Sequence, residues 1–146
     1  MLIGEYKNNL GNKHRVAVPK RFREQLDSQL IITRGYEGCL ILVSLGQWDN
    51  LTQEVASGPF VSISVRDTTR FLLGGAHEIE LDKQGRFVIP ANLIDFADID
   101  RDHGEVVFLG LGRWIEIWDS KKWDKRREYL AQSSGRIAEK LSEVKL

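Results

Sequence analysis

The stretch that decides the fold runs from Leu81 to Pro90 and reads Leu-Asp-Lys-Gln-Gly-Arg-Phe-Val-Ile-Pro. A related stretch lies 71 residues earlier, from Leu10 to Pro19, and reads Leu-Gly-Asn-Lys-His-Arg-Val-Ala-Val-Pro. The leucine, the arginine and the proline coincide in the two stretches. Self-similarity at a fixed offset indicates two copies of one structural unit. We therefore treat the chain as a duplication.

Each copy is predicted to hold two strand pairs with a helix between them. In the second copy, Glu78 to Leu81 alternates polar and apolar residues, which is typical of a half-buried strand. Asp82 to Gly85 is predicted as a turn, because Asp suits its first position and Gly its last. Arg86 to Ile89 returns as a strand, and Pro90 favours the start of a helix over 91–97.

The second strand pair of this copy is a hairpin of 105–109 and 114–118, joined through Gly110-Leu111-Gly112. The first copy has the same order, with strands over 3–7 and 15–18, a helix over 20–26, and strands over 30–33 and 39–43. Helices over 45–56 and 61–73 are predicted to link the copies, with Gly58-Pro59 as a breaker between them. A charged helix is expected over 121–141.

Neither copy is expected to be stable alone, because each exposes strand edges and buries little apolar area. The two copies should pack together into one β-rich core with helices outside it.

Composition excludes several classes of protein. With 146 residues, 42% of them hydrophobic and 29% charged, the chain is long enough for one packed domain or two small ones. The start lacks a signal-peptide pattern, and the apolar stretches are too short to cross a bilayer. The single cysteine, Cys39, cannot form an internal disulfide or a multi-cysteine zinc site, which fits a reducing cytoplasm.

Charge is balanced over the whole chain, with 21 basic and 21 acidic residues, but uneven along it. Residues 1–25 hold six basic and two acidic residues, whereas residues 74–105 hold three basic and eight acidic ones. The first copy is therefore the better candidate for binding a phosphate backbone, where each neutralised phosphate releases a counterion. The alternative is that these bases form a solvated surface.

Arg15 and Arg86 each follow a turn, at the base of a predicted protruding strand pair. A two-stranded ribbon can enter the major groove of DNA, where an arginine can bind guanine through two hydrogen bonds. The alternative is that each arginine pairs with a carboxylate inside the fold and locks its turn. The residues leave both interpretations open.

Signals for catalysis or metal binding are sparse. His14, His77 and His103 have no metal-ligand spacing, and the chain lacks a phosphate-binding loop and a nucleophile elbow. The acidic run from Asp98 to Asp102 imitates the start of a calcium loop, but His103 stands where glycine is needed. We expect no enzyme activity, no metal, no cofactor and no small-molecule substrate.

The motif Asp82-x-x-Gly85-Arg86-x-x-x-Pro90 resembles the signature of the AbrB-like swapped-hairpin superfamily of DNA-binding proteins. Two copies of the motif narrow the match. Their order, with Arg70-Phe71-Leu72-Leu73-Gly74 between them and Glu116-Ile117-Trp118-Asp119 after them, is similar to the MraZ family of bacterial transcriptional regulators. The resemblance covers about residues 1–130.

The resemblance implies a β-rich α+β fold in which two AbrB-like swapped-hairpin repeats form one pseudo-symmetric, double-psi-like barrel with flanking helices. On this basis the repeats are expected at 5–47 and 76–119, a helical linker at 48–75 and a C-terminal helix at 120–146.

The resemblance also implies a cytoplasmic, nucleoid-associated repressor of the division and cell-wall gene cluster, including its own promoter. It would bind short direct repeats in double-stranded promoter DNA as a ring-shaped homo-oligomer, without a membrane partner. The implied DNA-binding residue is Arg15, with Lys13 and Lys7 in support. Further candidates are His14, Lys20, Arg21, Arg23, Lys83 and Arg86.

A different class of function is a protein-interaction scaffold that regulates a neighbouring rRNA methyltransferase. Its surface would be the acidic second copy and the amphipathic C-terminal helix. A steep salt dependence of binding would favour DNA over this alternative.

The first copy departs from the motif at two positions, with Gly11 in place of Asp and His14 in place of Gly. We therefore expect the first turn to differ in geometry from the second. One hypothesis is that the turn flexes at Gly11, and that protonated His14 adds a donor for phosphate.

Overall fold

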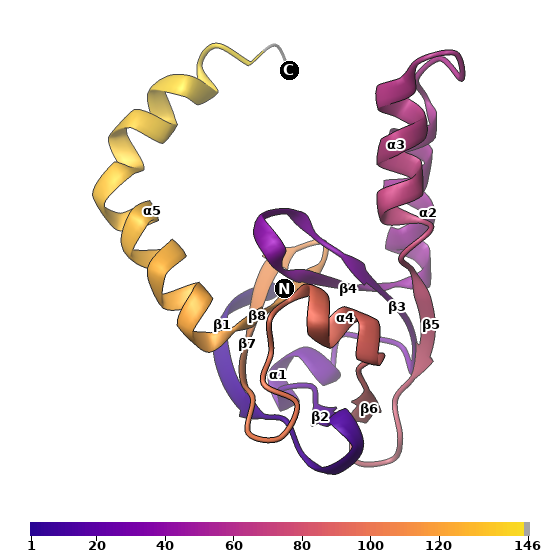
Figure 1. Cartoon of the computed structure of the whole chain (residues 1–146), viewed down its shortest axis with the longest axis vertical. Helices are drawn as coiled ribbons and strands as arrows, with labels where there is room; N and C mark the ends of the chain where they lie inside the picture. The colour runs from indigo at the N-terminus through magenta and orange to yellow at the C-terminus, as the bar shows by residue number, and fades with distance from the viewer. Residues whose placement is uncertain (145–146) are drawn as a thin grey trace.

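The computed structural model describes residues 1–144 as a six-stranded sheet, a two-stranded ribbon and helices packed around them (Figure 1). The strands are β1 (Leu2–Asn9), β2 (Arg15–Ala17), β3 (Gln29–Arg34), β4 (Leu40–Ser44), β5 (His77–Glu80), β6 (Arg86–Val88), β7 (Glu105–Gly112) and β8 (Ile115–Asp119). The α-helices are α1 (Lys20–Arg23), α2 (Leu45–Ala56), α3 (Ile63–Leu72), α4 (Ala91–Phe96) and α5 (Ser120–Leu141). Short 3₁₀ turns are η1 (Asn12–His14) and η2 (Tyr36–Gly38). The predicted β-rich α+β class is confirmed.

The main sheet is antiparallel throughout and has the strand order β1-β7-β8-β4-β3-β5. The equivalent strands of the two copies are β1 and β5, β3 and β7, and β4 and β8. When each strand is replaced by its equivalent, the order becomes β5-β3-β4-β8-β7-β1, which is the same sheet read from its other edge. The pairing therefore has a pseudo-twofold axis between β4 and β8, as a duplicated sequence should produce.

The prediction that each copy pairs its own first two strands is wrong. Strand β1 pairs with β7, β5 pairs with β3, and β2 pairs with β6, so each of these pairs joins the two copies. After the turn at 82–85, β6 leaves the sheet to which β5 belongs and enters the ribbon. The physical reason is that the unpaired backbone N–H and C=O groups of a strand edge can bond to any exposed strand edge, and the other copy has one.

A closed barrel is not formed among residues 1–144, because the sheet ends at the edge strands β1 and β5. The ribbon β2–β6 covers its inner face together with α1 and α4 (Figure 1). Buried side chains of these elements, Val16, Phe22, Phe87 and Leu93, belong to the same core as Phe108 of the sheet.

The predicted hairpin in the second copy is confirmed, but its connection lies later than predicted. Strand β7 continues through Gly112, and Leu111 N–H donates to the Trp114 carbonyl. Gly110 is needed for pairing with β1, because a Cβ on it would lie 2.6 Å from the backbone nitrogen of Ile3. Gly110 thus serves a close approach of two strands rather than a turn.

The outer face of the sheet is covered in two places. Helices α2 and α3 pack over Ile31, Ile41 and Val43, whereas α5 packs Trp123 against Trp118. Figure 1 shows α2 and α3 rising beyond the sheet on one side and α5 on the other. None of the described helices has a stretch long and apolar enough to cross a membrane.

Candidate nucleic-acid interface

The candidate interface is the outer face of the ribbon β2–β6. Val16 of β2 lies opposite Phe87 of β6, and both side chains are buried. Because successive side chains of a strand point to opposite faces, the flanking residues point outward. These flanking pairs are Arg15 opposite Val88, and Ala17 opposite Arg86. The ribbon thus places Arg15 and Arg86 diagonally on one outer face.

The second turn, Asp82 to Gly85, has the predicted geometry. Asp82 Oδ1 accepts the backbone N–H groups of Gln84 and Arg86, each at 2.9 Å. The pKa of Asp82 is lowered, first by the Arg86 N–H and then by the other donors. Gly85 has a left-handed φ of 73°, which suits glycine.

The first turn shares two features with the second and differs from it at others. Gly11 N–H donates to the Arg15 carbonyl at 2.7 Å, just as Asp82 N–H donates to the Arg86 carbonyl at 2.9 Å. His14, the equivalent of Gly85, has a left-handed φ of 62°. The prediction of a different geometry is confirmed at Lys13, whose left-handed φ of 59° has no counterpart at Gln84. It is also confirmed at the arginine N–H, which donates to the Asn12 carbonyl in the first turn and to the Asp82 carboxylate in the second.

Each turn is bonded to the other copy across the ribbon. Val18 N–H donates to the Gly85 carbonyl and Ile89 N–H to the His14 carbonyl, both at 2.9 Å. These two bonds are equivalent under the pseudo-twofold. They fix both turns at the ends of the ribbon, so each turn presents its side chains from a rigid support.

The two arginines of the ribbon have different surroundings. Arg86 Nε lies 3.1 Å from Asp82 Oδ2, so this arginine stabilises its own turn, although its side chain stays 40% exposed. Arg15 is exposed, and within residues 1–144 no carboxylate lies within ion-pair distance of its guanidinium. The turn-locking alternative therefore describes Arg86 and not Arg15.

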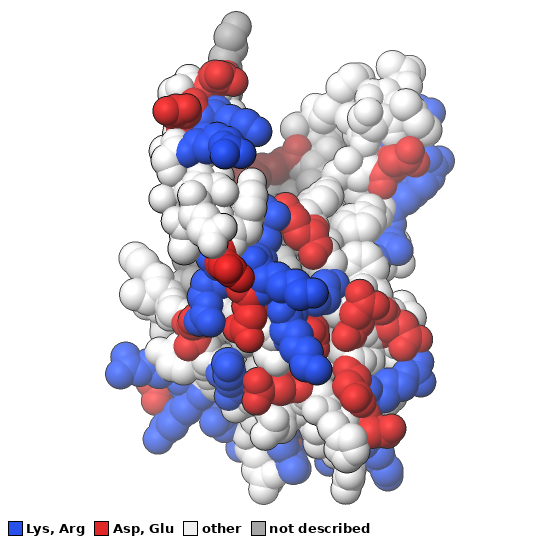
Figure 2. Space-filling model, turned by 60° about the vertical axis from the view of Figure 1, so that its left-hand side comes forward, with Lys and Arg blue, Asp and Glu red and all other residues white. Residues whose placement is uncertain are grey.

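Further cations surround the ribbon. Lys13 and Lys83 are exposed in the two turns, His14 is half-buried, and Lys20 and Arg21 are exposed on α1. Figure 2 shows Lys and Arg side chains along the lower end of the molecule, where the ribbon and turns lie in Figure 1.

Arg23 differs from its neighbours on α1, because its side chain reaches the second turn. Its guanidinium donates to the Gln84 carbonyl at 2.7 Å, and its Nε is buried. The side chain also fills the space that a Cβ on Gly85 would occupy. These contacts give Arg23 a structural role as a link between α1 and the turn of the other copy.

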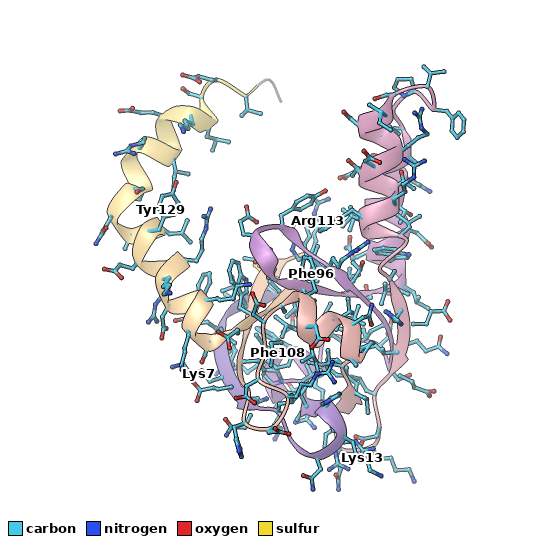
Figure 3. The ribbon with its side chains drawn as sticks, viewed as in Figure 1. Lys7, Lys13, Phe96, Phe108, Arg113 and Tyr129 are labelled. Carbon is cyan, nitrogen blue, oxygen red and sulfur yellow. The ribbon has the colours of Figure 1, made fainter. Side chains whose placement is uncertain are left out.

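Lys7 is not brought to the ribbon. It lies on β1, opposite Val107 of β7, and its Nζ is 3.8 Å from the Glu105 carboxylate. Figure 3 shows Lys7 at the side of the sheet and Lys13 at the lower end of the molecule. Arg15, Lys13 and Lys7 were the three leading candidates for DNA binding. Arg15 and Lys13 lie near each other, whereas Lys7 lies apart from them.

An acidic segment, residues 95–105, borders the first turn. Leu10 N–H donates to the Gly104 carbonyl at 2.7 Å. Arg101 binds Asp95 through Nε and Nη2 at 3.0 and 2.6 Å, and this contact is the main cause of the lowered pKa of Asp95. Within the described residues, no group of three or more His, Cys, Asp or Glu side chains is arranged to hold a metal ion.

Sequence reasoning missed Val88 as a surface residue. Its side chain is 44% exposed on the outer face of the ribbon, opposite Arg15. The alternation along 86–89 was the signal, since Phe87 and Ile89 are buried and the residue between them must point outward. An exposed valine beside an arginine can contact a thymine methyl group in the major groove.

Comparison with known proteins places these features in context. The chain matches the family model described as "MraZ protein, putative antitoxin-like" twice, over residues 1–71 and 72–143. A curated relative named "Transcriptional regulator MraZ" from Clostridium acetobutylicum is 40% identical over 144 residues, which is 99% of each chain. Relatives with the same name from Acetivibrio thermocellus and Thermoanaerobacter sp. are 39% and 38% identical, over 97% and 100% of each chain. The two matches of the family model agree with the duplication read from the sequence.

Proposed function

Since this chain belongs to the MraZ family, we propose that it is a sequence-specific DNA-binding transcriptional regulator that acts as a repressor. Its targets are the division and cell-wall gene cluster and its own promoter, where a ring of several copies binds short direct repeats. The protein would act in the cytoplasm, in association with the nucleoid. The pairing of strands across the two copies supports a swapped-hairpin architecture of the AbrB-like kind.

The observation that carries this proposal is the exposed Arg15 on a rigid two-stranded ribbon. The major groove of B-DNA, about 12 Å wide, admits a two-stranded ribbon. Val16 and Phe87 anchor the ribbon in the core, so Arg15 needs little reorganisation to bind. Lys13 and Lys83, which are exposed in the two turns, would contact phosphates on either side.

Assembly into a ring would allow tight DNA binding even if each copy contacts DNA weakly. Several copies held at a fixed spacing can bind neighbouring repeats together, so the overall affinity can exceed that of one copy by about 10²-fold or more. Each copy then needs only a small interface, which is what a ribbon of three residue pairs offers. Direct repeats in the DNA match copies that follow one another around a ring.

The test is binding of the DNA just upstream of the protein's own start codon by wild type and Arg15→Ala. Loss of a bidentate guanine contact costs about 1–3 kcal/mol, so we expect about 5- to 150-fold weaker binding to the specific site. If Arg15 contacts phosphate only, all sequences should weaken alike and the salt slope should fall by about one.

Arg113→Ala is the matched control. Arg113 is also an exposed arginine, at 60%, but Figure 3 shows it at the opposite end of the body from Lys13. This variant removes the same charge and should bind the promoter like wild type. Equal affinities of Arg15→Ala, Arg113→Ala and wild type would contradict the proposal.

A further inference from the structure

The outer face of the ribbon β2–β6 has two ends that the duplication makes equivalent. The offset of 71 residues relates Arg15 to Arg86 and Ala17 to Val88. Each end therefore carries one arginine opposite one small apolar residue, Arg15 opposite Val88 and Arg86 opposite Ala17. A protein surface with twofold symmetry suits a palindromic DNA site. The ribbon would suit such a site only if its two ends were alike.

The two ends differ in the side chains that they offer. Val88 is 44% exposed, whereas Ala17 is half-buried and its side chain is shorter. Arg15 is exposed and has no carboxylate within ion-pair distance among residues 1–144, whereas Arg86 is paired with Asp82 at 3.1 Å. Arg15 can therefore bind a base without giving up an ion pair. We call the end formed by Arg15 and Val88 the reading end.

The two side chains of the reading end are close neighbours. In an antiparallel ladder, hydrogen-bonded and non-hydrogen-bonded residue pairs alternate. Ile89 N–H donates to the His14 carbonyl, so the next pair, Arg15 and Val88, is a non-hydrogen-bonded one. The Cα atoms of such a pair lie about 4.5 Å apart, which is close to the rise of about 3.4 Å between successive base pairs. Side chains at this spacing can reach neighbouring base pairs in one groove.

The direction of Val88 is fixed before DNA binds. Phe87 and Ile89 on either side of it are buried, so the backbone holds Val88 on the outer face. A β-branched side chain also has few rotamers to lose in a strand. In the major groove, guanine offers two acceptors that suit arginine, and thymine offers a methyl group that suits an apolar side chain. The reading end carries one side chain for each.

We propose that Arg15 and Val88 read two neighbouring base pairs together, Arg15 binding a guanine and Val88 packing on the methyl group of a thymine. This inference rests on the DNA-binding function proposed above and assigns its sequence specificity to one end of the ribbon. Because the other end reads no base, each copy recognises a word without twofold symmetry. It then binds that word in one orientation, which is what direct repeats require.

Deleting the thymine methyl group tests the inference directly. The DNA upstream of the protein's own start codon is prepared once with thymine and once with deoxyuridine, which lacks only that methyl group. Burial of one such group changes affinity by about 4-fold, so wild type should bind the thymine form at least about 4-fold more tightly. Duplexes of unrelated sequence should show no preference, because nonspecific binding depends on phosphates.

Two variants of Val88 form a matched pair for this assay. Val88→Thr and Val88→Ser both introduce a hydroxyl group, but only threonine keeps a methyl group that can contact thymine. Val88→Thr should retain the preference for the thymine form, whereas Val88→Ser should bind both forms alike. Leu111→Ser, which changes a residue of β7 that is 42% exposed, should behave like wild type. Equal preference in wild type and Val88→Ser, or its loss in both Val88 variants, would overturn the inference.

Replacement of single bases locates the two contacts. The guanine bound by Arg15 is the one whose replacement by 7-deazaguanine, which lacks an acceptor, weakens wild type but not Arg15→Ala. Single deoxyuridines should weaken wild type most in the base pair next to that guanine, and a sensitive thymine at the far end of the site would overturn the inference. Wild type that binds the promoter without preferring thymine refutes this inference alone. Wild type that binds neither form refutes the proposed function, and this inference with it.

Discussion

Gly85→Ala is expected to destabilise the protein because Arg23 occupies the space beside this glycine. A Cβ at Gly85 would overlap Cδ of Arg23 and lie 2.5 Å from its Nε. The left-handed backbone, with φ at 73°, costs a residue with a side chain about 1–2 kcal/mol. Displacing Arg23 also breaks its bond to the Gln84 carbonyl, which contributes about 0.5 kcal/mol at an exposed site. Together these effects predict a loss of about 2 kcal/mol in the free energy of unfolding.

The double variant Arg23→Ala/Gly85→Ala separates the two contributions. Removing the arginine also removes the overlap, so the double variant should be no less stable than Gly85→Ala alone. Urea unfolding followed by fluorescence of the four tryptophans measures Gly85→Ala, Arg23→Ala and the double variant on one scale, provided that the slopes agree. Losses that simply add would refute the packing of Arg23 on Gly85. Additive losses would also make Arg23 a candidate for binding DNA again.

Three further predictions concern the core, a half-buried carboxylate and the first turn. Phe108→Ala removes a fully buried ring and should cost about 3–5 kcal/mol in urea unfolding; a loss below about 1 kcal/mol would place Phe108 outside the core. Burial, then the charge of Glu37, raises the pKa of Glu116 above its ordinary 4.5, so the stability it contributes is present below that value and lost as pH rises. Glu116→Gln should therefore gain stability relative to wild type between pH 5 and pH 8, and a constant difference would contradict this. His14→Gly, at φ 62°, should keep the fold and show a smaller change in promoter affinity between pH 6 and pH 8 than wild type; equal pH dependence would remove His14 from the interface.

Much of the secondary structure was predictable because local signals agreed with one another. The predicted and observed bounds of α2, Leu45–Ala56, are the same, and Ser44 caps it through its hydroxyl. The turn at 82–85 followed from the preferences of Asp and Gly, and the carboxylate of Asp82 makes the expected backbone contacts. The duplication was visible because arginine and proline recur at matched positions.

The pairing of strands could not be predicted in the same way. Alternation tells which face of a strand is buried but not which edge it pairs with. The pattern of 78–81 fits a partner at 86–89 as well as the observed partner β3. The glycines of 110–112 were ambiguous for a related reason, since glycine suits both a turn and a close approach of backbones.

The candidate interface was predictable in part. The charge count indicated the basic first copy and the resemblance indicated Arg15 and Lys13, which lie at the start of β2 and in the turn before it. Their surroundings needed the fold, because the ion pair of Arg86 and the position of Lys7 beside Glu105 depend on how the chain folds back. His14 shows the limit of a motif, since a residue other than glycine takes the left-handed position.

The pairing of β1 with β7 means that the main sheet can be completed only late in the synthesis of the chain. Leu2 lies opposite Gly112, so the first strand to leave the ribosome meets its partner only after more than a hundred further residues have been made. Contacts so distant in sequence slow folding and make it cooperative. During synthesis β1 therefore remains without its partner strand until β7 has been made. The two copies then complete the sheet together.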